Sequence, residues 1–341
     1  MQDAPASPPS WSNAVEHDVT TRDGRVLSVS EWGKRTGVPV FVLHGTPGSR
    51  RGVAPRPSLL YQLGVRLIAY DRPGYGGSSR APGRTVRDAA DDVEDIAEEL
   101  GVDEFAVVGR SGGGPHALAC AAVLPKRVTR AAALVTLAPK VGPGGMGADW
   151  FKGMSPGNVD EYSRASIGIH KIEDGLKARS STIFADPDTL ISNLLQEAQH
   201  ADARVISDAG IRRLLRDNYQ EALRGSAYGW IDDAMAFSRD WGFDPAEITV
   251  PVLLWHGKDD VFSPVEHARW LNDYIPTAEL RLETGKAHFD AMPALPDLLP
   301  WLKQSRPRSP ESRPPWVEPP EDQSRRPTPH GVTRSAAPVR D

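Results

Sequence analysis

Short apolar runs recur along the chain and give the first indication of its architecture. Residues 38–43 (VPVFVL) and 65–71 (VRLIAYD) are almost continuously apolar, which is typical of strands buried on both faces of a parallel sheet. Earlier in the chain, two runs of alternating apolar and polar residues flank Asp23-Gly24, and they predict a β-hairpin that precedes these strands. Further strands are predicted at residues 105–108, 131–137, 251–257 and 278–282.

Helical patterns alternate with these runs. Residues 85–101 carry an apolar stripe at helical spacing, which begins at a capping box of Thr85 and Asp88 and ends at Gly101. An Ala-rich helix is predicted from Gly112 to about Pro125. Strands that alternate with helices indicate an α/β fold, with a mostly parallel central sheet and helices on both of its faces.

The alternation stops over residues 139–241, where helical stretches such as TLISNLLQEAQHA dominate and no strand is evident. We interpret this segment as a helical cap inserted into an α/β core of residues 14–138 and 242–304. Residues 1–13 are rich in Pro and Ser, and residues 305–341 are rich in Pro, Arg and Glu. Both ends are therefore predicted to be disordered.

Composition excludes several classes of function. The net charge of −5 provides no general attraction for nucleic acid or for an acidic membrane. Cys120 is the only cysteine, so no intrachain disulfide can form. The N-terminus lacks the features of a signal peptide, and no stretch is apolar over the ~18 residues that a membrane span needs. We expect a cytoplasmic protein with a small-molecule substrate, and no feature indicates its oligomeric state.

The stretch VVGRSGGGPHA, residues 107–117, raises the question of chemistry. A predicted strand ends there in the pattern of a nucleophile elbow, a sharp strand-to-helix turn with Ser111 at its apex. Gly109 and Gly113 suit this turn, because strand and helix nearly touch on either side of the serine. An ordinary loop is also rich in Gly and Ser, so the interpretation depends on partners for the serine.

Those partners occur at the ends of other predicted strands. A serine nucleophile needs a base, and the base needs an orienting acid; on this kind of fold the chain order is Ser, acid, His. Asp259 and Asp260 follow the strand that ends in WHG, and His288 follows the last strand through ETGKAH. None of the other histidines combines this order with a strand-end loop.

Two backbone amides are candidates for stabilising an oxyanion. One is the N–H of Gly112, directly after the serine, and the other is the N–H of Thr46 in the loop HGTPGSR. The glycines of DRPGYGGSS are not followed by the lysine-serine signature of a phosphate-binding loop. No cofactor and no metal ion are predicted.

Five motifs together resemble the α/β-hydrolase superfamily: HGTPGS, DRPGYGGSS, GRSGGG, HGKDDVFSP and GKAH, in the order of that family. The resemblance covers residues 15–303 and implies the α/β-hydrolase fold. It also selects Asp260 as the acid and leaves Asp259 as second choice, since the family's acid stands three residues after the glycine of this motif. The usual glycine before the histidine is Ala287 here.

The resemblance also narrows the branch of the superfamily. Dehalogenase-like and epoxide-hydrolase-like members carry Asp at the elbow, whereas this chain has Ser111. The HGxPG loop and the helical cap resemble the proline-iminopeptidase-like branch, which includes esterases, lactonases and perhydrolases. The peptidases often carry HGGPG, and Thr46 replaces the second glycine here.

We therefore expect a serine hydrolase that cleaves a small ester, thioester, lactone or amide through an acyl-serine, with Ser111, His288 and Asp260 as a triad. The alternatives are an aminopeptidase of the proline-iminopeptidase type and a non-catalytic ligand-binding protein on the same fold. Aromatic residues in or near the cap are expected to pack its helices and in part to line an apolar pocket; these are Trp150, Phe151, Tyr162, Tyr228, Trp230 and Phe237.

Overall fold

A computed structural model of the chain describes residues 14–53 and 56–306. The chain divides into two units, residues 1–306 and residues 307–341. The predictions of disorder for residues 1–13 and for the tail beyond residue 306 lie outside the described residues. Within the part that is described, no helix is long and apolar enough to cross a membrane.

Eight strands of the described residues form a single sheet in the order β1-β2-β4-β3-β5-β6-β7-β8. The strands are β1 (Val15–Thr20), β2 (Val26–Gly33), β3 (Val38–Leu43), β4 (Val65–Tyr70), β5 (Phe105–Arg110), β6 (Val128–Leu134), β7 (Val252–Gly257) and β8 (Ala278–Glu283). The pairs β1–β2 and β2–β4 are antiparallel, and the pairs from β4 through β8 are parallel. The mostly parallel sheet predicted from the sequence is confirmed.

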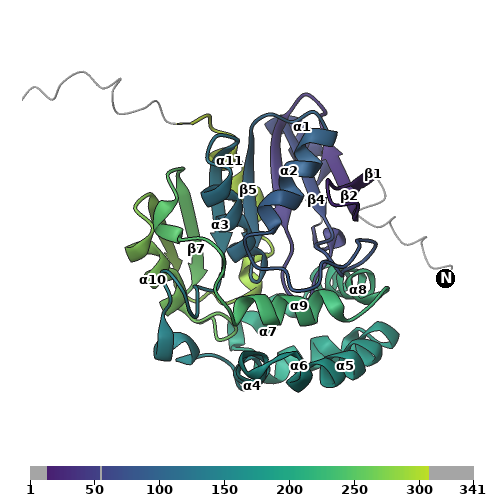
Figure 1. Cartoon of the computed structure of the whole chain (residues 1–341), viewed down its shortest axis with the longest axis vertical. Helices are drawn as coiled ribbons and strands as arrows, with labels where there is room; N and C mark the ends of the chain where they lie inside the picture. Colours follow the sequence, from purple (N-terminus) through teal and green to yellow (C-terminus); the bar gives the residue numbers. More distant parts are fainter. Residues whose placement is uncertain (1–13, 54–55, 307–341) are drawn as a thin grey trace, which may run out of the picture. The chain divides into compact units, whose positions relative to one another are not determined.

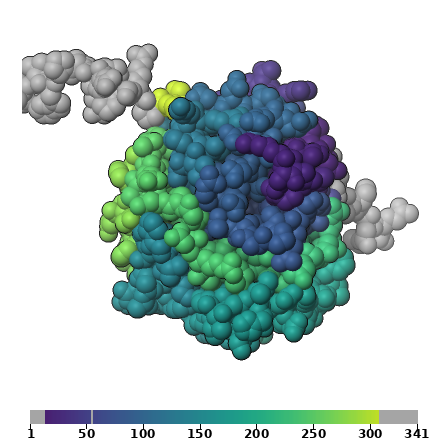
Figure 2. Space-filling model, viewed as in Figure 1, coloured from purple at the N-terminus to yellow at the C-terminus, as the bar shows by residue number. Residues whose placement is uncertain are grey.

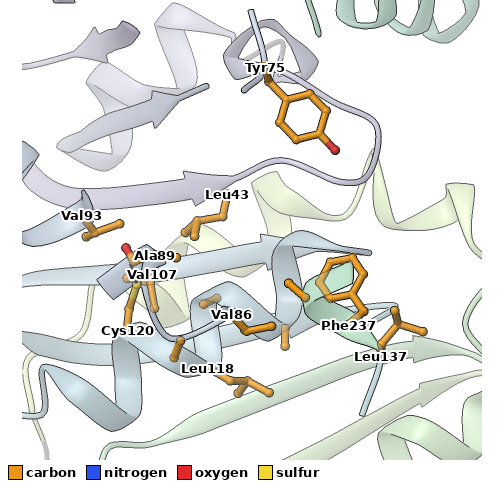
Figure 3. Close-up of a cluster of buried hydrophobic side chains, with 14 of the residues drawn as sticks. Leu43, Tyr75, Val86, Ala89, Val93, Val107, Leu118, Cys120, Leu137 and Phe237 are labelled. Atoms are coloured by element: carbon orange, nitrogen blue, oxygen red, sulfur yellow. Dashed lines mark hydrogen bonds between the residues drawn. The ribbon is translucent and has the colours of Figure 1, made fainter. Parts of the chain in front are cut away.

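Helices cover both faces of this sheet (Figure 1). They are α1 (Pro57–Leu63), α2 (Ala89–Glu99), α3 (Gly113–Val123), α10 (Val265–Tyr274) and α11 (Leu295–Leu302). Side chains alternate along each strand, so Val40 and Val42 pack with α1 and α11, whereas Phe41 and Leu43 pack with α2 and α3. Figure 3 shows part of the buried cluster on the side of α2 and α3, which includes Leu43 and the thiol of Cys120.

Residues 139–241, called the helical insertion below, lie between β6 and β7 in the sequence. Its helices are α4 (Pro156–Ile167), α5 (Glu173–Ala185), α6 (Asp188–Glu197), α7 (His200–Ile206), α8 (Ala209–Leu223) and α9 (Tyr228–Phe237). They lie along one edge of the sheet, with α8 and α9 next to it and α4, α5 and α6 farther out (Figure 1). The space-filling view shows this teal and green segment packed directly against the core (Figure 2).

Short 3-10 helices complete the described structure: η2 (Arg50–Gly52), η3 (Gly147–Phe151), η4 (Ile169–Lys171), η5 (Pro245–Glu247) and η6 (Phe289–Ala291). Two of them, η2 and η6, lie in loops that follow parallel strands, β3 and β8. Such loops gather at the carboxyl edge of the sheet, where open α/β folds bind their ligands.

Several boundaries differ by a few residues from those predicted. Helix α2 begins at Ala89 and not at Thr85, because the N–H groups of Ala89 and Ala90 bond three residues back, to the carbonyls of Val86 and Arg87, in a tight turn. Half of the capping box does form, since the carboxylate of Asp88 accepts the N–H of Thr85 at 2.7 Å. Strand β6 ends at Leu134, since Val135 has a left-handed φ of 45° that leaves the extended conformation.

Candidate active site

Ser111 occupies a strained turn between β5 and α3. Its φ is 54°, a left-handed value that is uncommon for any residue with a side chain. A Cβ on Gly109 would lie 2.0 Å from the carbonyl oxygen of Gly113, and a Cβ on Gly113 would lie 2.1 Å from that of Leu43. Only glycine fits these two positions, so the turn can form only with this pattern of residues.

Ser111, His288 and Asp260 are joined by hydrogen-bond contacts. The Oγ of Ser111 lies 3.0 Å from Nε2 of His288, and Nδ1 of His288 lies 2.8 Å from Oδ2 of Asp260. The other oxygen of Asp260 accepts the backbone N–H groups of Phe262 and Ser263 at 2.8 and 2.9 Å. The neighbouring Asp259 is exposed, so the structure brings only the second carboxylate of this pair to the histidine.

The surroundings of Asp260 keep it ionised. Burial alone would raise the pKa of its carboxyl, but the contacts with His288 and His256 outweigh burial and hold this pKa well below its ordinary value. An ionised carboxylate can only accept hydrogen bonds, so Nδ1 of His288 must carry the proton. Nε2 is thereby left free to accept a proton from Ser111.

The loop after β3 lies against the turn of Ser111. A Cβ on Gly45 would lie 3.4 Å from the Cβ of Ser111, and a Cβ on Gly112 would lie 2.2 Å from Oγ1 of Thr46. Thr46 and Gly112, the two residues predicted to supply oxyanion donors, therefore lie side by side next to Ser111. Gly112 can only be glycine there.

Asp233, on α9 of the helical insertion, holds this loop in place and was missed in the sequence. It is fully buried. Its carboxylate accepts hydrogen bonds from Thr46 at 2.5 Å, from Tyr75 at 2.8 Å, from Arg84 at 2.6 Å and from Arg72. Burial would raise its pKa, but the two guanidinium groups lower it below the ordinary range. Two acidic residues inside the otherwise apolar run YGWIDDAMAF were the signal that could have revealed it.

Asp202, on α7, is a second residue that the sequence did not reveal. Its Oδ1 accepts the backbone N–H of Phe289 at 2.6 Å, directly after His288. Its Oδ2 is buried and has no hydrogen-bond partner among the described residues. Burial raises the pKa of this carboxyl to about 6, against the lowering effect of His288. The insertion thus contacts the histidine loop as well as the loop of Thr46.

A cavity reaches Ser111 and His288 between the core and the helical insertion. Core and insertion both line it, with Gly45, Thr46, Arg110, Ser111 and His288 on one side and Glu161, Tyr162, Arg179, Glu197, Tyr219 and Trp230 on the other. The expectation of an apolar pocket is wrong, because four charged residues line the cavity. Trp150 does not reach it: this side chain is fully buried and donates to the carbonyl of Ala138 at 2.7 Å.

Across residues 14–53 and 56–306, no three His, Cys, Asp or Glu side chains are grouped so as to hold a metal ion.

Known proteins share this sequence pattern. Residues 38–294 match the protein family described as alpha/beta hydrolase fold. A non-heme chloroperoxidase of Streptomyces lividans is 28% identical, over 84% of this chain and 99% of the relative. A bifunctional esterase/perhydrolase of Acinetobacter calcoaceticus is 26% identical, over 73% of this chain and 83% of the relative. A proline iminopeptidase of Neisseria meningitidis is 26% identical, over 80% of this chain and 92% of the relative.

Solved structures share the fold. An esterase from Exiguobacterium antarcticum superimposes with a TM-score of 0.62 at 20% sequence identity, which covers 85% of this chain and 100% of that chain. At this level of identity the likeness concerns the arrangement of sheet and helices. The sequence relatives and the structural neighbour agree on the same architecture.

Proposed function

The chain belongs to the α/β-hydrolase fold family, and on that premise we propose that it is a serine hydrolase of a small carboxylic ester, thioester, lactone or amide. The observation that carries the proposal is the contact series Ser111–His288–Asp260, at 3.0 and 2.8 Å. These distances allow proton transfer between the groups in the ground state. The position of Ser111 on a strained turn supports a role as nucleophile.

Each residue has a defined role in the proposed reaction. Nε2 of His288 takes the proton of Ser111 as Oγ attacks the carbonyl carbon, and the N–H groups of Thr46 and Gly112 stabilise the oxyanion. His288 then protonates the leaving group, which departs and leaves an acyl ester on Ser111. Water, deprotonated by His288, attacks this ester, and His288 gives the proton to Oγ of Ser111 as the acid leaves. Asp260 stabilises the imidazolium in both halves of the reaction.

The helical insertion acts as a cap in this proposal. It supplies residues such as Tyr162 and Trp230 to the cavity that contains Ser111, and a substrate must pass beside it. Residues on the cap therefore contribute to the choice of substrate, while the chemical groups come from the core.

Replacement of the serine tests the proposal. We expect Ser111→Ala to fold normally and to lower kcat/KM on p-nitrophenyl acetate by roughly three orders of magnitude or more, since triad members act as a unit. A fluorophosphonate probe should label the wild type and the control Ser207→Ala, whose side chain is exposed. Labelling that persists in Ser111→Ala would contradict the assignment.

An aminopeptidase is the second candidate, favoured by the carboxylates of Glu161 and Glu197 in the cavity. A free amine on the substrate could pair with such a carboxylate. Turnover of proline p-nitroanilide at a higher kcat/KM than p-nitrophenyl acetate would select this candidate. Binding of esters without turnover of either substrate would select a non-catalytic ligand-binding protein.

A further inference from the structure

Arg110 directly precedes Ser111 and lines the same cavity. A Cβ on Gly45 would lie 3.8 Å from Nη2 of Arg110 and 3.4 Å from the Cβ of Ser111, so the two side chains meet at one glycine. The guanidinium therefore lies against the loop that carries Thr46, and Arg110 also lines a second cavity, between the sheet and the helices α1 and α11. A group bound to the guanidinium would lie within a few bonds of a carbonyl carbon held by Ser111.

This guanidinium has no anionic partner. The buried arginines next to the loop of Thr46 are paired with carboxylates: Arg50 with Asp71 and Glu221, and Arg72 and Arg84 with Asp233. Arg110 makes no hydrogen bond or ion pair within the described part of the chain. Burial lowers its pKa, and only Tyr219 counters this effect. The side chain of Arg110 is half-buried. A partly desolvated cation without a counter-ion would be stabilised by an anionic ligand.

Tyr219 of α8 adds a hydrogen-bond donor to the same place. It lines the cavity and is almost fully buried, and burial raises the pKa of its phenol to about 12, so the hydroxyl keeps its proton. Arg110 and Arg179 both act electrostatically on this phenol. A forked guanidinium and a neutral hydroxyl that line one cavity form a donor set suited to a carboxylate.

The carboxylates of the cavity lie elsewhere or are already engaged. Glu161 accepts the indole N–H of Trp230 at 2.8 Å and lies 3.5 Å from Arg179. Glu197 lies at the end of α6, in the outer layer of the helical insertion (Figure 1). The part of the cavity next to Ser111 thus carries an uncompensated positive charge.

We propose that Arg110 and Tyr219 bind a carboxylate on the acyl part of the substrate, so that the enzyme acts on esters, thioesters or lactones that carry a free carboxylate. The acyl part is assigned because the leaving group must face His288, whereas Arg110 lies against the loop of Gly45 and Thr46. This inference rests on the proposed function, since the acyl group must become attached to Ser111.

Kinetics on matched esters test the inference. The wild type should have a kcat/KM at least about tenfold higher for p-nitrophenyl hydrogen glutarate than for p-nitrophenyl pentanoate, which has the same chain length without the charge. Arg110→Met should reduce this ratio about tenfold or more, and Arg110→Lys should retain an intermediate ratio because the charge remains without the fork. Arg213→Met, an exposed arginine on the same helix as Tyr219, should leave the ratio unchanged.

Equilibrium binding separates this inference from the proposed function. Glutarate should bind Ser111→Ala, measured by calorimetry, and binding should be lost in Ser111→Ala/Arg110→Met. If neither ester is turned over, the proposed function fails, and the glutarate measurement still decides whether the anion site exists. If both esters are turned over with a ratio near one that Arg110→Met does not change, the inference fails alone. A preference for p-nitrophenyl esters of amino acids over both would also overturn it.

Discussion

At the scale of single residues, two adjacent aspartates have opposite environments. Asp260 is buried and accepts hydrogen bonds from His288, Phe262 and Ser263, whereas Asp259 is exposed. The two residues occupy consecutive positions in the loop after β7, and the backbone there directs one carboxylate into the site and the other towards solvent. The orientation of His288 therefore depends on only one of the two.

Asparagine substitutions measure this dependence. Asp260→Asn should lower kcat/KM on p-nitrophenyl acetate by about 10³–10⁴-fold, because the amide no longer fixes the tautomer in which Nε2 of His288 is the base. Asp259→Asn should change it less than about twofold. Steady-state kinetics on the two purified variants decide the matter. Equal losses, or a larger loss for Asp259→Asn, would show that the other carboxylate orients the base.

The three residues of the proposed triad could be predicted from the sequence, whereas the buried carboxylates that hold the surrounding loops could not. Ser111, Asp260 and His288 each follow a recognisable strand, so chain order and spacing place them at one edge of the sheet. The roles of Asp202 and Asp233 depend on where helices of the insertion dock, and no local pattern specifies that docking. Arg110 was visible in the motif, but its lack of a partner is a property of the folded cavity.

At the scale of elements, α7 and η6 are joined by two polar contacts, the pair of Arg204 with Asp290 and the buried carboxylate of Asp202. Asp202 of α7 accepts the N–H of Phe289 at the start of η6, next to His288. Its second oxygen has no partner within the described residues, and burial raises its pKa to about 6 from an ordinary 3.8. The native protein thus holds a proton on this group at pH values where the unfolded chain has released it.

The contribution of Asp202 to stability should therefore fall as the pH rises from about 4 to about 6, because over this window its carboxyl binds more protons in the native state than in the unfolded state. A shift of this size corresponds to at most about 3 kcal/mol in the free energy of unfolding. Asp92, whose pKa burial also raises to about 6, contributes to the same fall. The buried histidines His116 and His267, whose pKa burial lowers to about 3 and about 4, act in the opposite direction on the total stability. Asp202→Asn keeps an oxygen for Phe289 and removes this contribution of Asp202, so its free energy of unfolding should rise relative to that of the wild type between about pH 4 and pH 6, as measured by urea denaturation at several pH values. An unchanged slope would contradict the shift.

The elements themselves were largely predictable, but their limits were not. The continuous apolar runs of β3 and β4 identify buried strands from local sequence alone. Helix α2 starts later than its capping box predicts, because residues 86–90 form a tight turn with hydrogen bonds three residues back. The capping pattern is compatible with either such a turn or a first turn of α-helix, so it does not fix where the helix begins.

At the scale of the whole molecule, the helical insertion and the sheet share one buried cluster. Phe237 of α9 lies in the same cluster as Val107 of β5 and Leu118 of α3 (Figure 3). On the other face of the sheet, α11 completes the packing with Leu298, Leu299 and Leu302. The carbonyls of Gln304 and Ser305 accept hydrogen bonds from Arg130. The packing contacts of the described chain thus extend to its last residues.

Two truncations test where the folded unit ends. Removal of residues 307–341 should leave Tm within about 2 °C and should leave kcat/KM unchanged, because those residues form a separate unit. Removal of residues 295–341 deletes α11 as well and should lower Tm strongly or prevent folding, because it exposes an apolar face of the sheet. Thermal denaturation and ester hydrolysis measure both effects. A large loss of activity from the shorter deletion would assign the tail a function.

Asp233 limits how this architecture can acquire a new specificity. Its carboxylate comes from the insertion, and its four donors come from the loops of the core. A chimera that received the insertion of a relative without an aspartate here would leave two buried arginines uncompensated and the loop of Thr46 without its anchor. The helical insertion is therefore not an interchangeable module. Substrate choice can diversify through the side chains that face the cavity, on condition that position 233 stays fixed.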